Sequence, residues 1–132
     1  MENNSLFILL CSCEHEKVQM AAMIASVAAV SERPVTVFVS MGAVSVFENG
    51  LDPAERYRGQ AFSNIMKEKK APDAMELFAQ GKMLGDLKMY VCSMALDVMG
   101  WDESNLIADL FEGPMGLTRF LDEAEKGQIV TL

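Results

Sequence analysis

The stretch LKMYVCSMALDVMG, residues 87–100, contains the transition that decides the fold of this chain. Residues 87–91 alternate as the side chains of a β-strand do. Residues 93–99 have the pattern of a short helix, and Gly100 closes it, as glycine commonly does at a helix C-terminus. Cys92 stands between the two. The stretch therefore predicts a strand that passes directly into a helix, with a thiol at the junction.

Strands and helices alternate along the rest of the chain as well. Strands are expected from apolar or β-branched runs at residues 5–12, 34–40, 87–91 and 128–132, with a fifth, short one near 111–112. Helices are expected at residues 14–30, 41–50, 73–84, 93–99, 102–111 and 117–125, with Asp73 and Asp102 as N-caps. This alternation predicts one flavodoxin-like α/β domain over residues 1–132, with three layers (α/β/α) and a mostly parallel sheet of four to five strands.

Residues 51–72 interrupt this rhythm. They contain two prolines, one glycine and charges of both signs, and only the spacing of Phe62, Ile65 and Met66 suggests a short helix. Connections of this length are uncommon in compact domains and often serve as lids. The segment is therefore predicted to be a long connection or lid, either less ordered than the rest or covering the edge of the sheet near Cys92.

Charge and composition exclude several classes of function. The 132 residues carry a net charge of −8, and the only dense basic run is KEKK at 67–70, so nucleic-acid binding is not expected. The longest uncharged stretch, 18–31, is too short to span a bilayer. The start of the chain has no pattern of a secretory signal. These features predict a cytoplasmic protein with no membrane span.

The three cysteines all fall at predicted strand ends. Cys11 lies at the carboxyl end of the first strand, Cys13 lies just past it, and Cys92 follows the carboxyl end of the third. In open α/β sheets, sites form beyond the carboxyl ends of the strands, so the three thiols are expected at one edge. Cys92 also precedes a helix, whose unpaired N–H groups favour the reactive thiolate over the neutral thiol. Cys92 is therefore the candidate reactive residue, with Cys11 and Cys13 as secondary thiols. Since free cysteine often acts as a small buried apolar residue, plain burial is the alternative role for Cys92 and the favoured role for Cys11, and the role of Cys13, which lies past the strand, stays open.

The helix expected at 14–30 is apolar on nearly all sides. A helix of this kind is buried on more than one face. Since one sheet covers only one face, the sequence predicts that a second copy of the chain covers the other.

The segment YVCSMALDVMGW, residues 90–101, resembles the DsrE/DsrF-like sulfur-relay family, which includes the DsrE and TusD subunits. In that family a strand ends in a cysteine, and a short helix and a glycine follow; Cys92 and Gly100 hold those places here. PVTVFVSMGAV (34–44), MKEKKAPDAMELFAQGKMLGDLKMYVC (66–92) and GPMGLTRFLDEAEKGQIVTL (113–132) are similar to the family as well.

The resemblance implies a function and an assembly. It implies that Cys92 holds sulfur as a persulfide, without a cofactor, as a carrier or sulfurtransferase. It implies donor and acceptor partners, either persulfide proteins or TusA-like carriers, and a homotrimer or homohexamer. Cys11 and Cys13 have no counterpart in the family pattern.

Two other functions remain open at this stage. CSCEH, residues 11–15, offers two thiols and the only histidine, so Cys11, Cys13, His15 and Cys92 would form a zinc or other soft-metal site if they converged. His15 is otherwise expected to be exposed in the first turn of its helix. The second possibility is a non-catalytic oligomeric scaffold in which Cys92 is silent. A nucleotide-binding module is disfavoured, because the chain has neither a G-x-G-x-x-G motif nor a P-loop.

Overall fold

The computed structural model describes residues 4–132, which form a five-stranded parallel sheet with helices on both faces. The strands lie in the order β4-β3-β2-β1-β5. They are β1 (Ser5–Leu10), β2 (Val35–Val39), β3 (Leu87–Cys92), β4 (Gly113–Met115) and β5 (Gly127–Thr131). The helices are α1 (His15–Val30), α2 (Pro53–Arg56), α3 (Ala61–Glu68), α4 (Ala74–Leu84), α5 (Ser93–Met99) and α6 (Leu117–Ala124), with 3₁₀ helices η1 (Met41–Phe47) and η2 (Glu103–Asn105).

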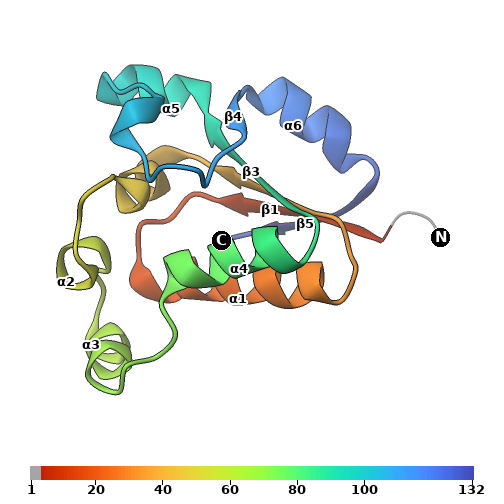
Figure 1. Cartoon of the computed structure of the whole chain (residues 1–132). Helices are drawn as coiled ribbons and strands as arrows, with labels where there is room; N and C mark the ends of the chain where they lie inside the picture. Colours follow the sequence, from red (N-terminus) through yellow and green to blue (C-terminus); the bar gives the residue numbers. More distant parts are fainter. Residues whose placement is uncertain (1–3) are drawn as a thin grey trace.

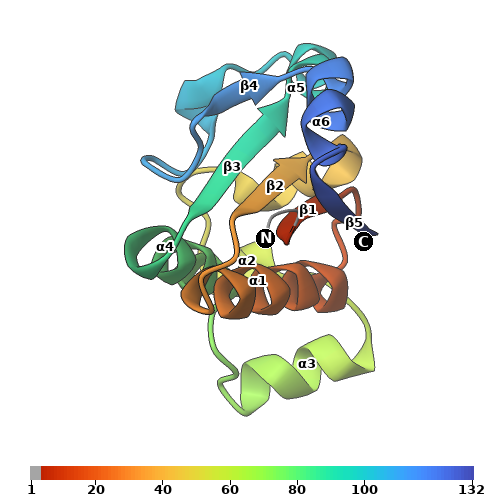
Figure 2. The same cartoon turned by 90° about the vertical axis from the view of Figure 1, so that its right-hand side faces the viewer.

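The helices form two layers, as the sequence predicted. Figures 1 and 2 show α1 and α4 on one face of the sheet and α5 and α6 on the other. The short fifth strand expected near 111–112 is β4, two residues further along. The three-layer α/β/α prediction is therefore confirmed. No helix among residues 4–132 has both the length and the apolar character needed to cross a membrane.

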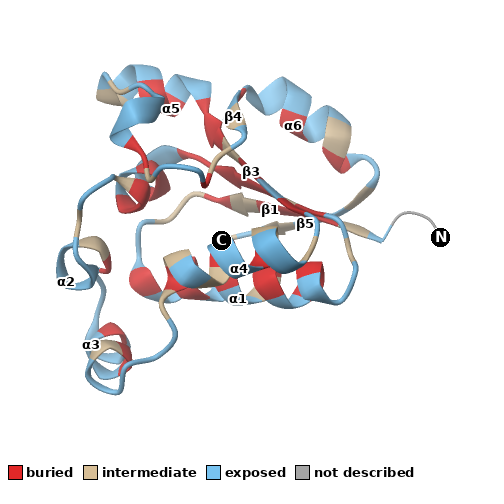
Figure 3. Ribbon diagram, in the orientation of Figure 1, coloured by how far each residue is buried: buried red, intermediate tan, exposed pale blue. Residues whose placement is uncertain are grey.

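The core fills both sides of the sheet (Figure 3). On the α6 side, Phe120 stacks on Phe38, with ring centroids 4.9 Å apart, and meets the edge of Phe7. On the other side, α1 packs against α4 through buried alanines. Gly85, which follows α4, lies so close to α1 that a Cβ atom there would stand 2.3 Å from the Ala29 carbonyl oxygen. Small residues thus let the two helices and the sheet pack closely.

Local capping signals place the helices that flank the site. The Asp73 carboxylate accepts a hydrogen bond from the Glu76 N–H at the start of α4, as predicted. Gly100 ends α5 with φ of 68°, a left-handed conformation that glycine adopts without strain.

The prediction of a helix over residues 102–111 is correct at its N-cap and wrong at its end. Asp102 does cap a turn, but the helical part ends at Asn105. The Ile107 N–H then donates to the Phe47 carbonyl oxygen at 2.9 Å, and Asp109 has φ of 64°. These contacts with η1 bury Leu106 and Leu110, so tertiary packing overrides the local helical pattern.

Residues 51–72 contain two short helices, α2 and α3, rather than one. Both lie near the carboxyl ends of the strands, beside the start of α1 (Figures 1 and 2). Met66 of α3 is buried, whereas Phe62 and Ile65 remain exposed. That this segment acts as a lid stays a prediction.

Candidate functional site

Cys92 occupies the junction between strand and helix that the sequence indicated. It is the last residue of β3, pairs with Met115 of β4, and is the N-cap residue of α5. Only 6% of its surface is exposed. The neighbouring Ser93 hydroxyl donates to the Met115 carbonyl oxygen at 3.5 Å, which ties the start of α5 to β4. The thiol is thus held at the carboxyl edge of the sheet and largely shielded from solvent.

An apolar groove of about 330 Å³ lies along α5, next to this junction. Its lining consists of Met41, Gly42, Met94, Ala95, Val98 and Met99. Met41, Met94 and Val98 are at least half exposed. Methionine side chains adapt easily to different partners. The surface beside Cys92 is therefore apolar and adaptable, and sequence analysis did not identify it as a groove.

Cys11 lies at the same edge, two strands away from Cys92. The residues just before the two cysteines, Leu10 and Val91, are both in register with Val39 of β2. Adjacent strands are about 4.8 Å apart, so the Cα atoms of Leu10 and Val91 are separated by about 10 Å. The Cα atoms of Cys11 and Cys92, which follow them, are therefore also about 10 Å apart. A disulfide needs Cα atoms within about 7 Å. Direct disulfide formation between Cys11 and Cys92 would therefore require movement of the backbone.

The surroundings of Cys11 disfavour its reactive form. Cys11 is half-buried, and its N–H donates to the Leu132 carbonyl oxygen at 2.8 Å. Burial raises the pKa of the Cys11 thiol, and negative charge on Cys92 raises it further. Since the thiolate is the nucleophile, Cys11 is a poorer nucleophile at neutral pH than an ordinary cysteine.

Cys13 is exposed and lies beyond β1. Its Sγ atom would be 3.9 Å from a Cβ atom built on Gly42, which also lines the groove along α5. Cys13 itself borders a separate hollow of about 260 Å³, together with Arg56 and Arg58. Cys13 therefore lies close to Gly42, at one side of the groove along α5.

His15 is not the exposed residue that the sequence suggested. It is buried, its ring stacks on Tyr57 with centroids 4.6 Å apart, and its Nδ1 atom shares a hydrogen bond of 2.7 Å with the Ser63 hydroxyl. These partners hold the ring in a place set by residues 57–63, which sequence analysis could not anticipate.

The metal-site alternative does not fit this geometry. His15 is engaged with Tyr57 and Ser63 rather than with the thiols. Across residues 4–132, no group of three or more His, Cys, Asp and Glu side chains is arranged to hold a metal ion. The four residues of the proposed zinc site are thus not brought together.

Residues 52–132, which include β3, Cys92 and α5, match the model of the DsrE/DsrF/DrsH-like family. The chain belongs to this family. The resemblance seen in the sequence around Cys92 is thereby confirmed. No curated protein sequence matches the chain significantly.

Two solved structures share the fold of this family member over nearly its whole length. MTH1491 from Methanobacterium thermoautotrophicum, a protein of unknown function, is 11% identical, with a TM-score of 0.66 over 98% of this chain and 100% of its own. The ychN protein from E. coli is 15% identical, with a TM-score of 0.66 over 98% of this chain and 99% of its own. At these identities the likeness concerns the fold alone.

Proposed function

We propose that this protein carries sulfane sulfur as a persulfide on Cys92 and passes it to a thiol of a partner protein. The observation that carries the proposal is the position of Cys92 at the carboxyl end of β3, directly before α5, in a chain of the DsrE/DsrF/DrsH-like family. Membership supports sulfur relay in general, and the position of Cys92 supports this residue as the carrier.

The reaction consists of two exchanges at sulfur. The Cys92 thiolate attacks the outer sulfur of a donor persulfide, a new S–S bond forms, and the donor leaves as a thiolate. An acceptor thiolate then attacks the outer sulfur on Cys92, takes it up and releases the Cys92 thiolate. No electrons are gained or lost overall, so neither step needs a redox cofactor. The rate of each step depends on the fraction of the attacking thiol that is ionised and on its access to the outer sulfur atom, as in thiol–disulfide exchange.

The surroundings of Cys92 suit a carrier that protects its cargo. Its 6% exposure would shield a bound persulfide from solvent and oxidants. The neighbouring apolar groove offers a partner protein a surface on which to dock. Small shifts of α5 or η1 would then open the thiol to the partner. Three free cysteines are consistent with a reducing, cytoplasmic location, which belongs to the same proposal.

Intact-mass spectrometry of single Cys→Ser variants after treatment with polysulfide tests the proposal. The wild type should gain increments of about 32 Da, the mass of one sulfur atom. Cys92→Ser should lose them, whereas Cys11→Ser and Cys13→Ser should retain them. If Cys92→Ser still gains sulfur like the wild type, Cys92 is not the carrier and the CSC pair becomes the candidate.

A further inference from the structure

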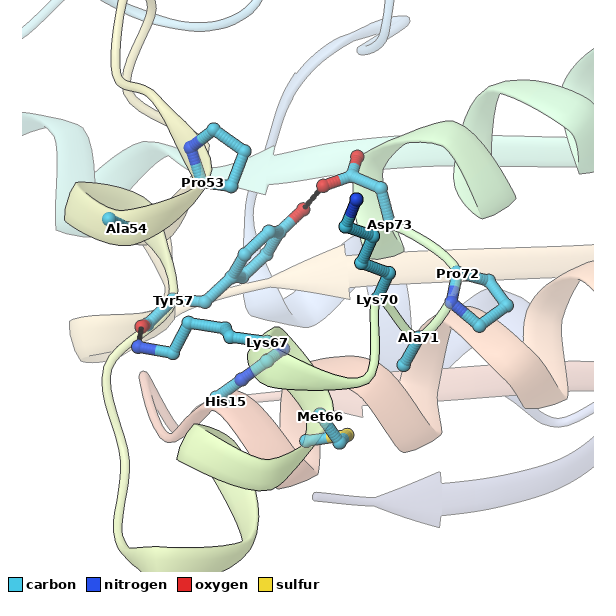
Figure 4. A pocket seen from close by; sticks show the side chains of 10 residues that line it. All are labelled: His15, Pro53, Ala54, Tyr57, Met66, Lys67, Lys70, Ala71, Pro72 and Asp73. Atoms are coloured by element: carbon cyan, nitrogen blue, oxygen red, sulfur yellow. Dashed lines mark hydrogen bonds between the residues drawn. The ribbon is translucent and has the colours of Figure 1, made fainter.

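A further cavity lies beside the start of α1, and no cysteine lines it. It has a volume of about 360 Å³, within the range of about 300–1,000 Å³ that small-molecule sites occupy. Figure 4 shows the side chains that form it: His15, Pro53, Ala54, Tyr57, Met66, Lys67, Lys70, Ala71, Pro72 and Asp73.

Hydrogen bonds that involve three helices and the residue after α2 hold the walls of this cavity in place. The Tyr57 hydroxyl donates to Asp73 Oδ1 at 2.7 Å and accepts from the Met75 N–H at 3.1 Å. Lys67 Nζ donates to the Tyr57 carbonyl oxygen at 2.6 Å, and Gln19 Nε2 donates to that of Pro72 at 2.9 Å. These bonds join α1, α3, α4 and the residue after α2. The cavity is therefore largely formed before any ligand arrives.

The cavity is positively charged in a protein that is otherwise strongly negative. Residues 56–70 contain five of the eleven Lys and Arg residues of the chain and one acidic residue. Lys67 and Lys70 line the cavity, and no carboxylate of residues 4–132 forms a salt bridge with either. The Asp73 carboxylate, which accepts from Tyr57 and from the N–H of Glu76, offsets one of these two charges. The lining therefore keeps a net positive charge.

The remaining lining is mostly apolar. Pro53, Ala54, Met66, Ala71 and Pro72 supply hydrocarbon surface beside the two ammonium groups. An inorganic anion would satisfy the charge and leave this surface uncovered, whereas a neutral apolar molecule would leave the charge unpaired. Lys67 is bonded to the Tyr57 carbonyl oxygen, whereas the ammonium group of Lys70 points away from it on the Asp73 side of the cavity (Figure 4). We infer that the cavity binds a small organic anion with an apolar body, such as a carboxylate, whose charge lies by Lys70.

An amide-resolved NMR titration of the full chain tests this inference with three probes. Benzoate has both the charge and the apolar body, benzamide has the same body without the charge, and inorganic phosphate has charge alone. Benzoate should shift the amides of residues 53–73 and bind about tenfold more tightly than either other probe, as expected for a charge-assisted contact. Equal binding of benzoate and benzamide, or shifts confined to residues that do not line the cavity, would overturn the inference.

Two neighbouring lysines supply a matched pair of variants. Lys70→Gln removes a cavity charge that has no hydrogen-bond partner among the described side chains, and should weaken benzoate binding about tenfold. Lys69→Gln removes the same charge from an exposed neighbour that does not line the cavity, and should leave the affinity unchanged. If both variants bind benzoate like the wild type, the cavity is not an anion site. Neither variant touches Cys92, so this test is independent of the sulfur-carrier proposal.

Discussion

At the scale of single residues, the surroundings of Cys11 and of His15 shift the pKa values of these two side chains in opposite directions. Cys11 and Cys92 share one edge of the sheet, yet burial and the charge of Cys92 keep Cys11 in its thiol form. Cys11 is thus better suited to hold a proton than to attack sulfur. His15 is shifted in the opposite sense, since burial and then the charge of Lys67 lower its pKa, and Asp73 only partly offsets them.

The lowered pKa of His15 predicts a loss of stability on acidification. As the pH falls below about 6.5, the unfolded chain takes up a proton on His15 before the folded chain does. The contribution of His15 to stability is therefore complete above pH 6.5 and is lost as the pH falls through the folded-state pKa. The free energy of unfolding is measured with urea at pH 7.5 and at pH 5.5, on either side of the usual histidine pKa of about 6.5. Between these two pH values it should fall further for the wild type than for His15→Asn.

His15→Asn is a clean comparison because the chain has no other histidine. Asparagine can still form a hydrogen bond with Ser63 but does not titrate. If the variant and the wild type lose stability in parallel between the two pH values, the ring of His15 is not shielded as the structure indicates.

At the scale of elements, the sequence predicted the helix caps and strands that depend on contacts between neighbouring residues. The Asp73 cap, the strand 87–91 and the Gly100 terminus follow from neighbouring residues, and the structure contains each of them. The burial of His15 and the cavity around Tyr57 depend instead on contacts between residues far apart in the chain. The end of η2 at Asn105 likewise depends on pairing with Phe47. No local pattern carries such information.

The junction between α4 and β3 provides a prediction about packing. Gly85 has an extended conformation that alanine also adopts, so a substitution there acts through space alone. Because an alanine Cβ would lie 2.3 Å from the Ala29 carbonyl oxygen, Gly85→Ala should destabilise the fold by about 1–3 kcal/mol. Gly116→Ala is the control, since nothing lies within 4 Å of its Cβ position. Urea denaturation that gave both variants the same midpoint would contradict this account of the helix packing.

At the scale of the whole molecule, α1 has an apolar stripe that the domain leaves uncovered. The side chains of Met20, Met23, Val27 and Val30 are between 44% and 66% exposed. Covering a side chain such as that of Val27 contributes about 1.5–3 kcal/mol. The stripe therefore supports the predicted assembly into trimers or hexamers, which stays a prediction.

Light scattering of charge variants tests that assembly. The wild type should have three or six times the protomer mass of 14.5 kDa. Val27→Lys should shift the protein toward monomers, because it places a charge in the stripe that a neighbouring protomer would cover. Leu121→Lys on α6, at an exposed apolar position on the other face of the sheet, is the control and should not change the mass. A wild type that is monomeric at micromolar concentration would contradict the prediction.

The claim that Cys92 carries the sulfur is tested most directly by peptide mapping of the wild-type protein. Trypsin separates the thiols, because cleavage after Lys17, Lys88 and Arg119 places Cys11 and Cys13 in peptide 1–17 and Cys92 in peptide 89–119. After polysulfide treatment and alkylation, the additional mass of about 32 Da should be found on peptide 89–119. Additional sulfur on peptide 1–17, with peptide 89–119 unmodified, would contradict the assignment of Cys92 as the carrier.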